Sequence, residues 1–488
     1  MSSGRWIFSG KSYQRPLGES ELAYYYPSEP NGLGDMFLHI AFRAERKIMN
    51  TDRVIRAWAL LRLKHPLLMS QVVTDGLPPH FAFTPHSSLE AALSNSQDAL
   101  YSKNDPKEKL ISDYMDGPRT LSSTSLSCLV ISEPNPHLKG DEGEYDLLMC
   151  APHYLGDGAS LHQCTHDLLL LLASPVADAD LEQNLVLQIQ QSCWGELLPL
   201  ALENRLSAPN NRWAKAASDV NLVKTLQREI GGHTFSRSQR GPQRTVLEEV
   251  SFTETQTSAI LAKCKSRNVT VNHALFALCN VAWGRTSSRP EAVRDPLMMY
   301  TAINLRPFLL PHPASTYWFV ALSYYNVVLP AYLPPTSSVF WLRAQTVKSQ
   351  TRKIVQSPFL PARALDMART RAARVQGKPN PTAVALPGPQ LASLTGTLPQ
   401  PAPPSACLIG LSLIGNLDAT YARSSYPSIT LHTVTTASRQ KAGGLLLLEH
   451  TFGKKLWLHL CWDENGFQEG QIENFWKNLQ DAVVDYLI

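Results

Sequence analysis

The chain of 488 residues has a formal net charge of +4 that is spread without a dense basic block, which argues against a dedicated nucleic-acid-binding protein. Hydrophobic residues make up 44% of the chain and charged residues 18%, which describes a globular protein with enough apolar material for a large core. Because this length exceeds what one core usually supports, two lobes are expected.

Neither the hydrophobic runs nor the cysteines indicate export or a membrane anchor. No apolar run approaches the roughly 20 residues that cross a bilayer, and the first residues lack the apolar segment of a secretory signal. The eight cysteines are scattered without a Cys-x-x-Cys pair, which argues against a disulfide framework or structural zinc and favours a reducing compartment. We therefore expect a cytoplasmic monomer with no membrane span.

The first lobe is expected to span residues 1–206. Hydrophobic alternation over 36–42 predicts a strand, and the polar stretch 94–122 is interpreted as a surface excursion. The apolar segment 145–151 predicts a buried strand, and the leucine-rich segment 159–173 predicts the helix that follows it.

A segment poor in apolar residues, 207–245, is interpreted as the connector between the lobes, with a helical piece around 220–230. The second lobe is expected over 246–488, and its chain closes with a helix over 471–487. Within it, proline recurs through 377–404, which predicts a long loop because proline ends helices and inner strands. We interpret this loop as an insertion without a binding role rather than as a ligand for an SH3-like partner.

The most informative motif lies between the predicted strand and helix of the first lobe, where His153 and Asp157 are four positions apart. A histidine at the end of a rigid strand can project into a cleft, and its near-neutral pKa suits a general base. The aspartate can cap the following helix or hold the turn through an ion pair. Gly156 and Gly158 are expected to serve a bend with no room for a Cβ atom.

Two further histidines, His162 and His166, are spaced like metal ligands on one face of a helix. The zinc-protease pattern would need glutamate at position 163, where the chain has Gln163. We therefore interpret them as partly solvated or core-edge histidines and predict no metal site.

The His-x-x-x-Asp-Gly pattern, followed by a small residue and a serine, resembles the active-site motif of the chloramphenicol-acetyltransferase-like acyltransferases. These include plant BAHD acyltransferases, fungal trichothecene O-acetyltransferases, alcohol acetyltransferases and condensation domains of nonribosomal peptide synthetases. Other segments resemble that superfamily in the same order, so the resemblance spans nearly the whole chain: Arg15–Glu21, Asn268–Leu278, Ala302–Pro307, Ser323–Val328, Ser412–Asp418 and Leu456–Trp462.

Two departures narrow the resemblance. Pro152 stands where condensation domains usually carry the first histidine of a pair, and Ser438–Gly444 replaces the DFGWG signature of the plant enzymes. Fungal acetyltransferases of the trichothecene type also lack strict versions of both marks, so this chain resembles them most.

The resemblance implies an α/β fold of two lobes, each a mixed β-sheet flanked by helices, with an active-site tunnel between them. It also implies one-step transfer of an acyl group, expected to be acetyl, from acyl-CoA to a hydroxyl of a specialised metabolite such as a terpenoid or polyketide. In that reaction His153 is the general base, acyl-CoA is a co-substrate, and no cofactor is permanently bound.

The remaining site residues follow from the same resemblance. Asp157 is expected to be structural and to pair with Arg306, with a plain helix cap as the competing interpretation. Arg439 and Lys441 are candidates for the phosphates of the cofactor, although surface solvation is the commoner fate of such side chains. The oxyanion donor is open among four unranked residues: Asn416, Ser412, Tyr325 and Asn326.

Two other functions stay open. One is a freestanding condensation-type acyltransferase that takes its acyl chain from a carrier protein, against which Pro152 counts slightly. The other is a noncatalytic scaffold or binding protein, against which the set His153, Asp157 and Arg306 counts.

Overall fold

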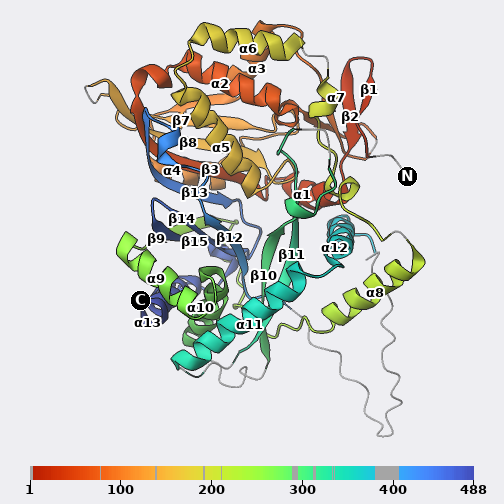
Figure 1. The fold of residues 1–488 in the computed structure, drawn as a ribbon, viewed down its shortest axis with the longest axis vertical. Coiled ribbons are helices and arrows are strands. Elements are labelled where there is room, and N and C mark those ends of the chain that lie inside the picture. The colour runs from red at the N-terminus through yellow and green to blue at the C-terminus, as the bar shows by residue number, and fades with distance from the viewer. Residues whose placement is uncertain are drawn as a thin grey trace.

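The computed structural model describes residues 4–488 apart from 77, 138–139, 191–192, 210, 288–294, 312–314, 332–333, 335 and 380–405. Two lobes are stacked in Figure 1, and each contains a mixed β-sheet flanked by helices, which confirms the predicted architecture. Most of the predicted loop 377–404 lies outside the described residues.

The first lobe is built on a sheet with the strand order β13-β3-β8-β7-β6. Its central strands β3 (Asp35–Glu45) and β8 (Glu142–Pro152) pair antiparallel along their whole length. Both are apolar because both faces are covered, one by α2 and α5 and the other by α4 and strands of the second lobe. The other elements named here are β6 (Leu100–Lys103), β7 (Cys128–Ser132), β13 (Ile429–Ser438), α2 (Thr51–Lys64), α4 (Lys107–Asp116) and α5 (Gly158–Ala173).

The expected surface excursion over 94–122 is wrong in its central part. It contains α4, whose residues Leu110, Ile111, Tyr114 and Met115 are buried against the sheet, because they recur at helical spacing. The lobe is completed by a small sheet of order β1-β2-β5-β4 and by four helices. These are β1 (Ile7–Ser9), β2 (Ser12–Pro16), β4 (Gln71–Val73), β5 (His80–Phe83), α1 (Glu19–Ser28), α3 (Leu89–Asp98), α6 (Asp178–Gln190) and α7 (Trp194–Leu197).

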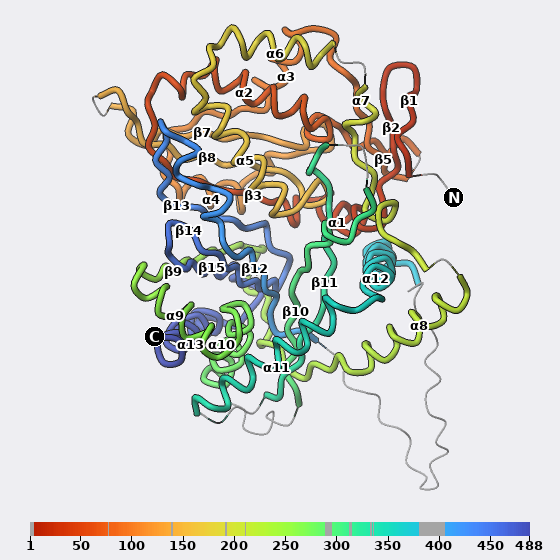
Figure 2. Tube along the Cα trace, in the orientation of Figure 1, coloured from red at the N-terminus to blue at the C-terminus, as the bar shows by residue number. Residues whose placement is uncertain are grey.

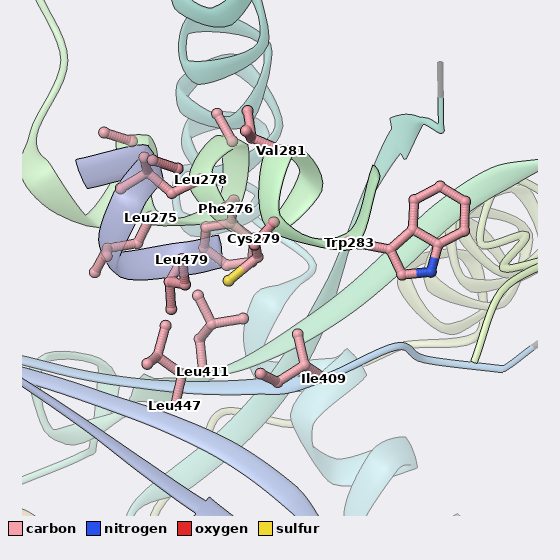
Figure 3. Packing of buried hydrophobic residues seen from close by; sticks show 14 of the residues in the cluster. Leu275, Phe276, Leu278, Cys279, Val281, Trp283, Ile409, Leu411, Leu447 and Leu479 are labelled. Atoms are coloured by element: carbon pink, nitrogen blue, oxygen red, sulfur yellow. The ribbon is translucent and has the colours of Figure 1, made fainter. Parts of the chain in front are cut away.

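The second lobe is built on a sheet with the order β11-β10-β12-β14-β15-β9. Figure 3 shows its core, where Leu275 and Phe276 of α10 and Leu479 of α13 face Leu411 and Leu447 of the sheet. None of the helices in the described ranges is long and apolar enough to cross a membrane. The elements are β9 (Thr245–Ser251), β10 (Pro296–Asn304), β11 (Leu322–Pro330), β12 (Gly410–Asn416), β14 (Leu445–Phe452), β15 (Lys455–Asp463), α9 (Glu254–Ser266), α10 (Val271–Thr286), α11 (Ser337–Val355) and α13 (Gln471–Leu487).

Two helices lie beside these layers. The predicted connector contains α8 (Arg212–Leu226), which begins earlier than the expected 220–230 because the Asn211 side chain caps it by accepting two backbone N–H groups. The second helix, α12 (Leu360–Val375), packs against α1 of the first lobe and β11 of the second. α12 therefore bridges the lobes.

The chain also crosses between the lobes through β13. Figure 2 shows its blue trace running with the first lobe, although β12 and β14 on either side of it belong to the second. β13 pairs antiparallel with β3 and forms the edge of that sheet. The boundaries 1–206, 207–245 and 246–488 stay a prediction, but sheet membership does not follow them here.

Candidate active site

The His-x-x-x-Asp-Gly motif forms the turn between two elements of the first lobe. β8 ends at Pro152, and α5 begins at Gly158 with Asp157 as its N-cap. The turn is closed by a hydrogen bond from the Leu155 N–H to the Pro152 carbonyl, 3.0 Å long. A rigid strand and a capped helix thus hold His153 from both sides.

The imidazole of His153 is fixed in one orientation. Its Nδ1 lies 3.0 Å from the carbonyl oxygen of Gly156, and its ring stacks on Tyr24 of α1 with centroids 4.0 Å apart and planes 9° apart. Because a carbonyl only accepts, Nδ1 carries the hydrogen and Nε2 keeps its lone pair. Burial lowers the pKa of His153, the Asp157 charge raises it and the Arg371 charge lowers it. The neutral form suits a general base near pH 7.

Asp157 is buried and uses both carboxylate oxygens. Oδ1 accepts from the Ser160 N–H at 3.2 Å, which is the cap of α5. Oδ2 lies 2.9 Å from Nη1 of Arg306 and accepts from the Ala321 N–H at 3.0 Å. The cap and the ion pair, which the sequence presents as alternatives, are therefore present together.

Arg306 extends this contact across the lobes. It follows β10 of the second lobe, and its Nη2 donates to Ser160 Oγ and to the carbonyls of Tyr317 and Phe319, at 3.0 to 3.2 Å. The pair with Asp157 therefore fastens a second-lobe loop to the turn that carries His153. Neither side chain needs to touch a substrate to do so.

The two glycines of the motif differ in whether a side chain would fit at their position. A Cβ atom on Gly156 would lie 2.7 Å from Cε3 of Trp318, which is fully buried, so this position has no room for a side chain. A Cβ on Gly158 would meet nothing within 4 Å. The expected steric reason for glycine is therefore wrong at Gly158.

Residues that the sequence did not single out surround Tyr24, the ring that stacks on His153. The Tyr24 hydroxyl contacts the hydroxyl of Tyr324 on β11, so the lobes meet here. The Arg371 guanidinium of α12 lies over both rings, 4.5 Å from the Tyr24 centroid and 4.6 Å from that of Tyr324. The alternation of β11 could have shown that positions 324 and 325 face opposite ways, but not which one faces the site.

The four predicted oxyanion candidates are scattered. Tyr325 points into the second-lobe core, where its hydroxyl donates to Thr351 at 3.3 Å, and Asn326 donates to Glu229 at 2.8 Å. Asn416 accepts the Asp418 N–H at 3.0 Å, and Ser412 pairs with Leu448 in register. Within the described residues, the structure joins none of the four to His153 by a hydrogen bond.

The two predicted phosphate-binding residues have different surroundings. Arg439 donates to the carbonyls of Gly117 and Pro118 at 3.0 and 3.3 Å, so the first lobe already holds its guanidinium. The Lys441 side chain is exposed, and partial desolvation and the charges of Arg237, Arg374 and Arg371, in that order, lower its pKa. Lys441 is therefore within electrostatic reach of three arginines, and we name these four residues the basic cluster.

The histidine pair on α5 contacts tyrosines. His162 Nδ1 lies 3.0 Å from the Tyr421 hydroxyl, and His166 Nδ1 contacts the hydroxyl of Tyr426. Burial lowers the pKa of His162 to about 3. Across the described part of the chain, no group of three or more histidine, cysteine or acidic side chains could hold a metal ion.

The arrangement of two lobes, each with a mixed sheet, is the chloramphenicol-acetyltransferase-like fold that the sequence resemblance implied. The chain is similar to the structure of TRI3 trichothecene 15-O-acetyltransferase from Fusarium sporotrichioides, with a TM-score of 0.76 and 13% identity over 99% of this chain and 98% of that one. It is similar to the condensation domain of the Monacolin K polyketide synthase MokA, with a TM-score of 0.61 and 10% identity over 99% of both chains.

A third similar structure is polyketide synthase associated protein 5 from Mycobacterium tuberculosis, with a TM-score of 0.56 and 13% identity over 97% of this chain and 98% of that one. No model of a protein family matches the sequence, and no curated protein matches it. At these identities the likeness establishes the fold of acyltransferases and condensation domains.

Proposed function

We propose that the protein is a CoA-dependent acyltransferase that moves an acyl group, acetyl in the first instance, onto a hydroxyl of a specialised metabolite such as a terpenoid or polyketide. The observation that carries this proposal is the imidazole of His153. Its Nδ1 is occupied by the Gly156 carbonyl at 3.0 Å, which leaves Nε2 as a base. The fold shared with an acetyltransferase supports the same conclusion.

The proposed reaction needs one proton carrier. Nε2 of His153 takes the proton of the acceptor hydroxyl as its oxygen bonds to the thioester carbonyl carbon. When the tetrahedral intermediate collapses, the carbon–sulfur bond breaks and Nε2 returns the proton to the leaving sulfur. Holding donor and acceptor together supplies the proximity that makes direct attack feasible, so no acyl-enzyme is required.

The basic cluster supports a donor that carries phosphates. Lys441 has three arginines as neighbours, and their combined positive charge favours an anionic ligand. Coenzyme A has several phosphates, whereas the phosphopantetheine arm of a carrier protein has one. Transfer from a carrier-protein thioester remains the second candidate because the fold is also that of a condensation domain.

Thiol release from acetyl-CoA tests the proposal with a panel of hydroxylated terpenoids and polyketides. The wild type should release thiol only when an acceptor is present, and His153→Ala should slow turnover about 100-fold or more, because a general base contributes at least that much. A folded His153→Ala protein with normal turnover would contradict the assignment. Release from a loaded carrier protein but not from acetyl-CoA would favour the second candidate.

A further inference from the structure

Arg371 is the member of the basic cluster that lies over two tyrosine rings. Its guanidinium lies over the rings of Tyr24 and Tyr324, and no ion pair joins it to a carboxylate within the described residues. Burial disfavours its charge, yet the pKa of Arg371 is raised because the oxygens of Tyr24 and Tyr324 outweigh burial. A cation that has no carboxylate partner can stabilise negative charge that develops nearby during a reaction.

The tyrosines connect this cation to the base. The Arg371 guanidinium lies 4.5 Å from the ring centroid of Tyr24, and the Tyr24 hydroxyl contacts the hydroxyl of Tyr324. Either hydroxyl can donate in this contact, so one of the two O–H groups is left for another acceptor. A phenol O–H becomes a stronger donor when a cation lies over its ring.

The same tyrosines lie beside the proposed base. The Tyr24 ring stacks on one face of the His153 imidazole with the ring centroids 4.0 Å apart, and the Tyr24 hydroxyl contacts the Tyr324 hydroxyl. Tyr24 therefore contacts both His153 and Tyr324. Tyr324 belongs to β11 of the second lobe, whereas His153 lies on a turn of the first lobe. In acyl transfer, the carbonyl oxygen gains negative charge while the nucleophile faces the base, so the oxyanion donor is expected on a different element from the base.

We propose that Tyr324 donates the hydrogen bond that stabilises the thioester carbonyl oxygen as it becomes negatively charged, and that Arg371, whose guanidinium lies over the Tyr324 ring, strengthens this hydroxyl as a donor. The inference rests on the acyl transfer proposed above. As the acceptor oxygen bonds to the carbonyl carbon, the π electrons of the C=O bond move onto the carbonyl oxygen, which accepts a hydrogen bond from the Tyr324 hydroxyl. They return when the carbon–sulfur bond breaks. Tyr324 is then a catalytic residue and Arg371 a positioning residue.

The first test compares Tyr324→Phe with its neighbour Tyr325→Phe. Removing an oxyanion donor should lower kcat for acetyl-CoA about 100-fold and change KM little, because the hydrogen bond is strongest in the transition state. Tyr325→Phe removes a hydroxyl that bonds to Thr351 at 3.3 Å on the far side of β11, so its kcat should stay near that of the wild type. An unchanged kcat in Tyr324→Phe, or a raised KM alone, would overturn the proposal.

The second test isolates the charge of Arg371. Two charges shift the pKa of His153: that of Asp157 at the start of α5, and that of Arg371 on α12, which lies over the Tyr24 ring that stacks on the imidazole. Arg371 lowers the pKa of His153, so Arg371→Met should raise it and move the acid limb of kcat/KM to higher pH. Arg371→Lys keeps the charge and should keep the limb near its wild-type position. NMR titration of the His153 ring without substrate gives the same readout independently of turnover.

The outcomes separate this inference from the function on which it rests. A loss of melting temperature in Arg371→Met with an unmoved His153 titration would make Arg371 merely structural and overturn its part in the proposal. If Tyr324→Phe transfers the acyl group at the wild-type rate, the inference is overturned but the proposed acyltransferase function is not. A wild type that releases no thiol from any acyl donor would overturn both.

Discussion

Gly156 shows how one atom can constrain the turn that carries His153. Its carbonyl holds Nδ1 of His153 at 3.0 Å, and its missing Cβ leaves space for the buried ring of Trp318. Alanine there would place a Cβ 2.7 Å from Trp318 Cε3. Either the indole or the carbonyl must move, so position 156 couples packing to the orientation of the base.

Gly156→Ala should therefore cost about 1 to 3 kcal/mol of unfolding free energy, as overpacking does, and also lower kcat because the imidazole loses its fixed orientation. Gly158→Ala is the matched control. Its Cβ has open space at the first position of α5, so it should be neutral or stabilise by up to about 1 kcal/mol. Urea denaturation measures both. Equal losses in the two variants would show that the Trp318 contact does not decide the effect.

At the scale of elements, the basic cluster brings together side chains from α12, the connector and the loop between β13 and β14. Lys441→Met should raise KM for acetyl-CoA about tenfold with kcat nearly unchanged, because a bond to a phosphate acts equally in ground and transition states. Added salt should weaken the binding of acetyl-CoA to the wild type more than its binding to Lys441→Met.

The control for that variant is Lys47→Met. Lys47 is 77% exposed in the first lobe and pairs with Glu45, so its loss should leave KM unchanged. A fall in kcat with constant KM in Lys441→Met would contradict a phosphate role and indicate a contact with the reacting atoms.

The elements also show where prediction from sequence ends. The strand, turn and helix around His153 are readable because an apolar run, a capping residue and a helical pattern are all local signals. The contact between Asp157 and Arg306 is not local, but both residues sit in motifs that a family resemblance can supply. Tyr24 and Arg371 lie in no such motif, and the resembling segment Ser323–Val328 does not show which of its residues faces His153. The meeting of Tyr24, Tyr324 and Arg371 depends on how α1, β11 and α12 pack, which no spacing in the sequence encodes.

At the scale of the whole molecule, three of the contacts between the lobes stand out. β13 adds a second-lobe segment to the first-lobe sheet, α12 packs on α1, and Arg306 pairs with Asp157. The second lobe cannot unfold without pulling an edge strand from the first. We therefore expect a single cooperative transition in which the two lobes lose structure together.

The Asp157–Arg306 pair is the connection that one substitution can remove. Arg306→Met leaves a fully buried carboxylate facing two backbone N–H groups without its counter-charge, so it should cost about 3 to 5 kcal/mol. The pair Arg43–Glu142 is a suitable control because its side chains are 49% and 57% exposed, and Arg43→Met should cost about 1 kcal/mol or less. Urea unfolding followed by tryptophan fluorescence and far-ultraviolet circular dichroism would measure both. If Arg306→Met splits the unfolding transition into two, this ion pair couples the lobes. If Arg306→Met loses no more unfolding free energy than Arg43→Met, then β13 and α12 hold the lobes together without the ion pair.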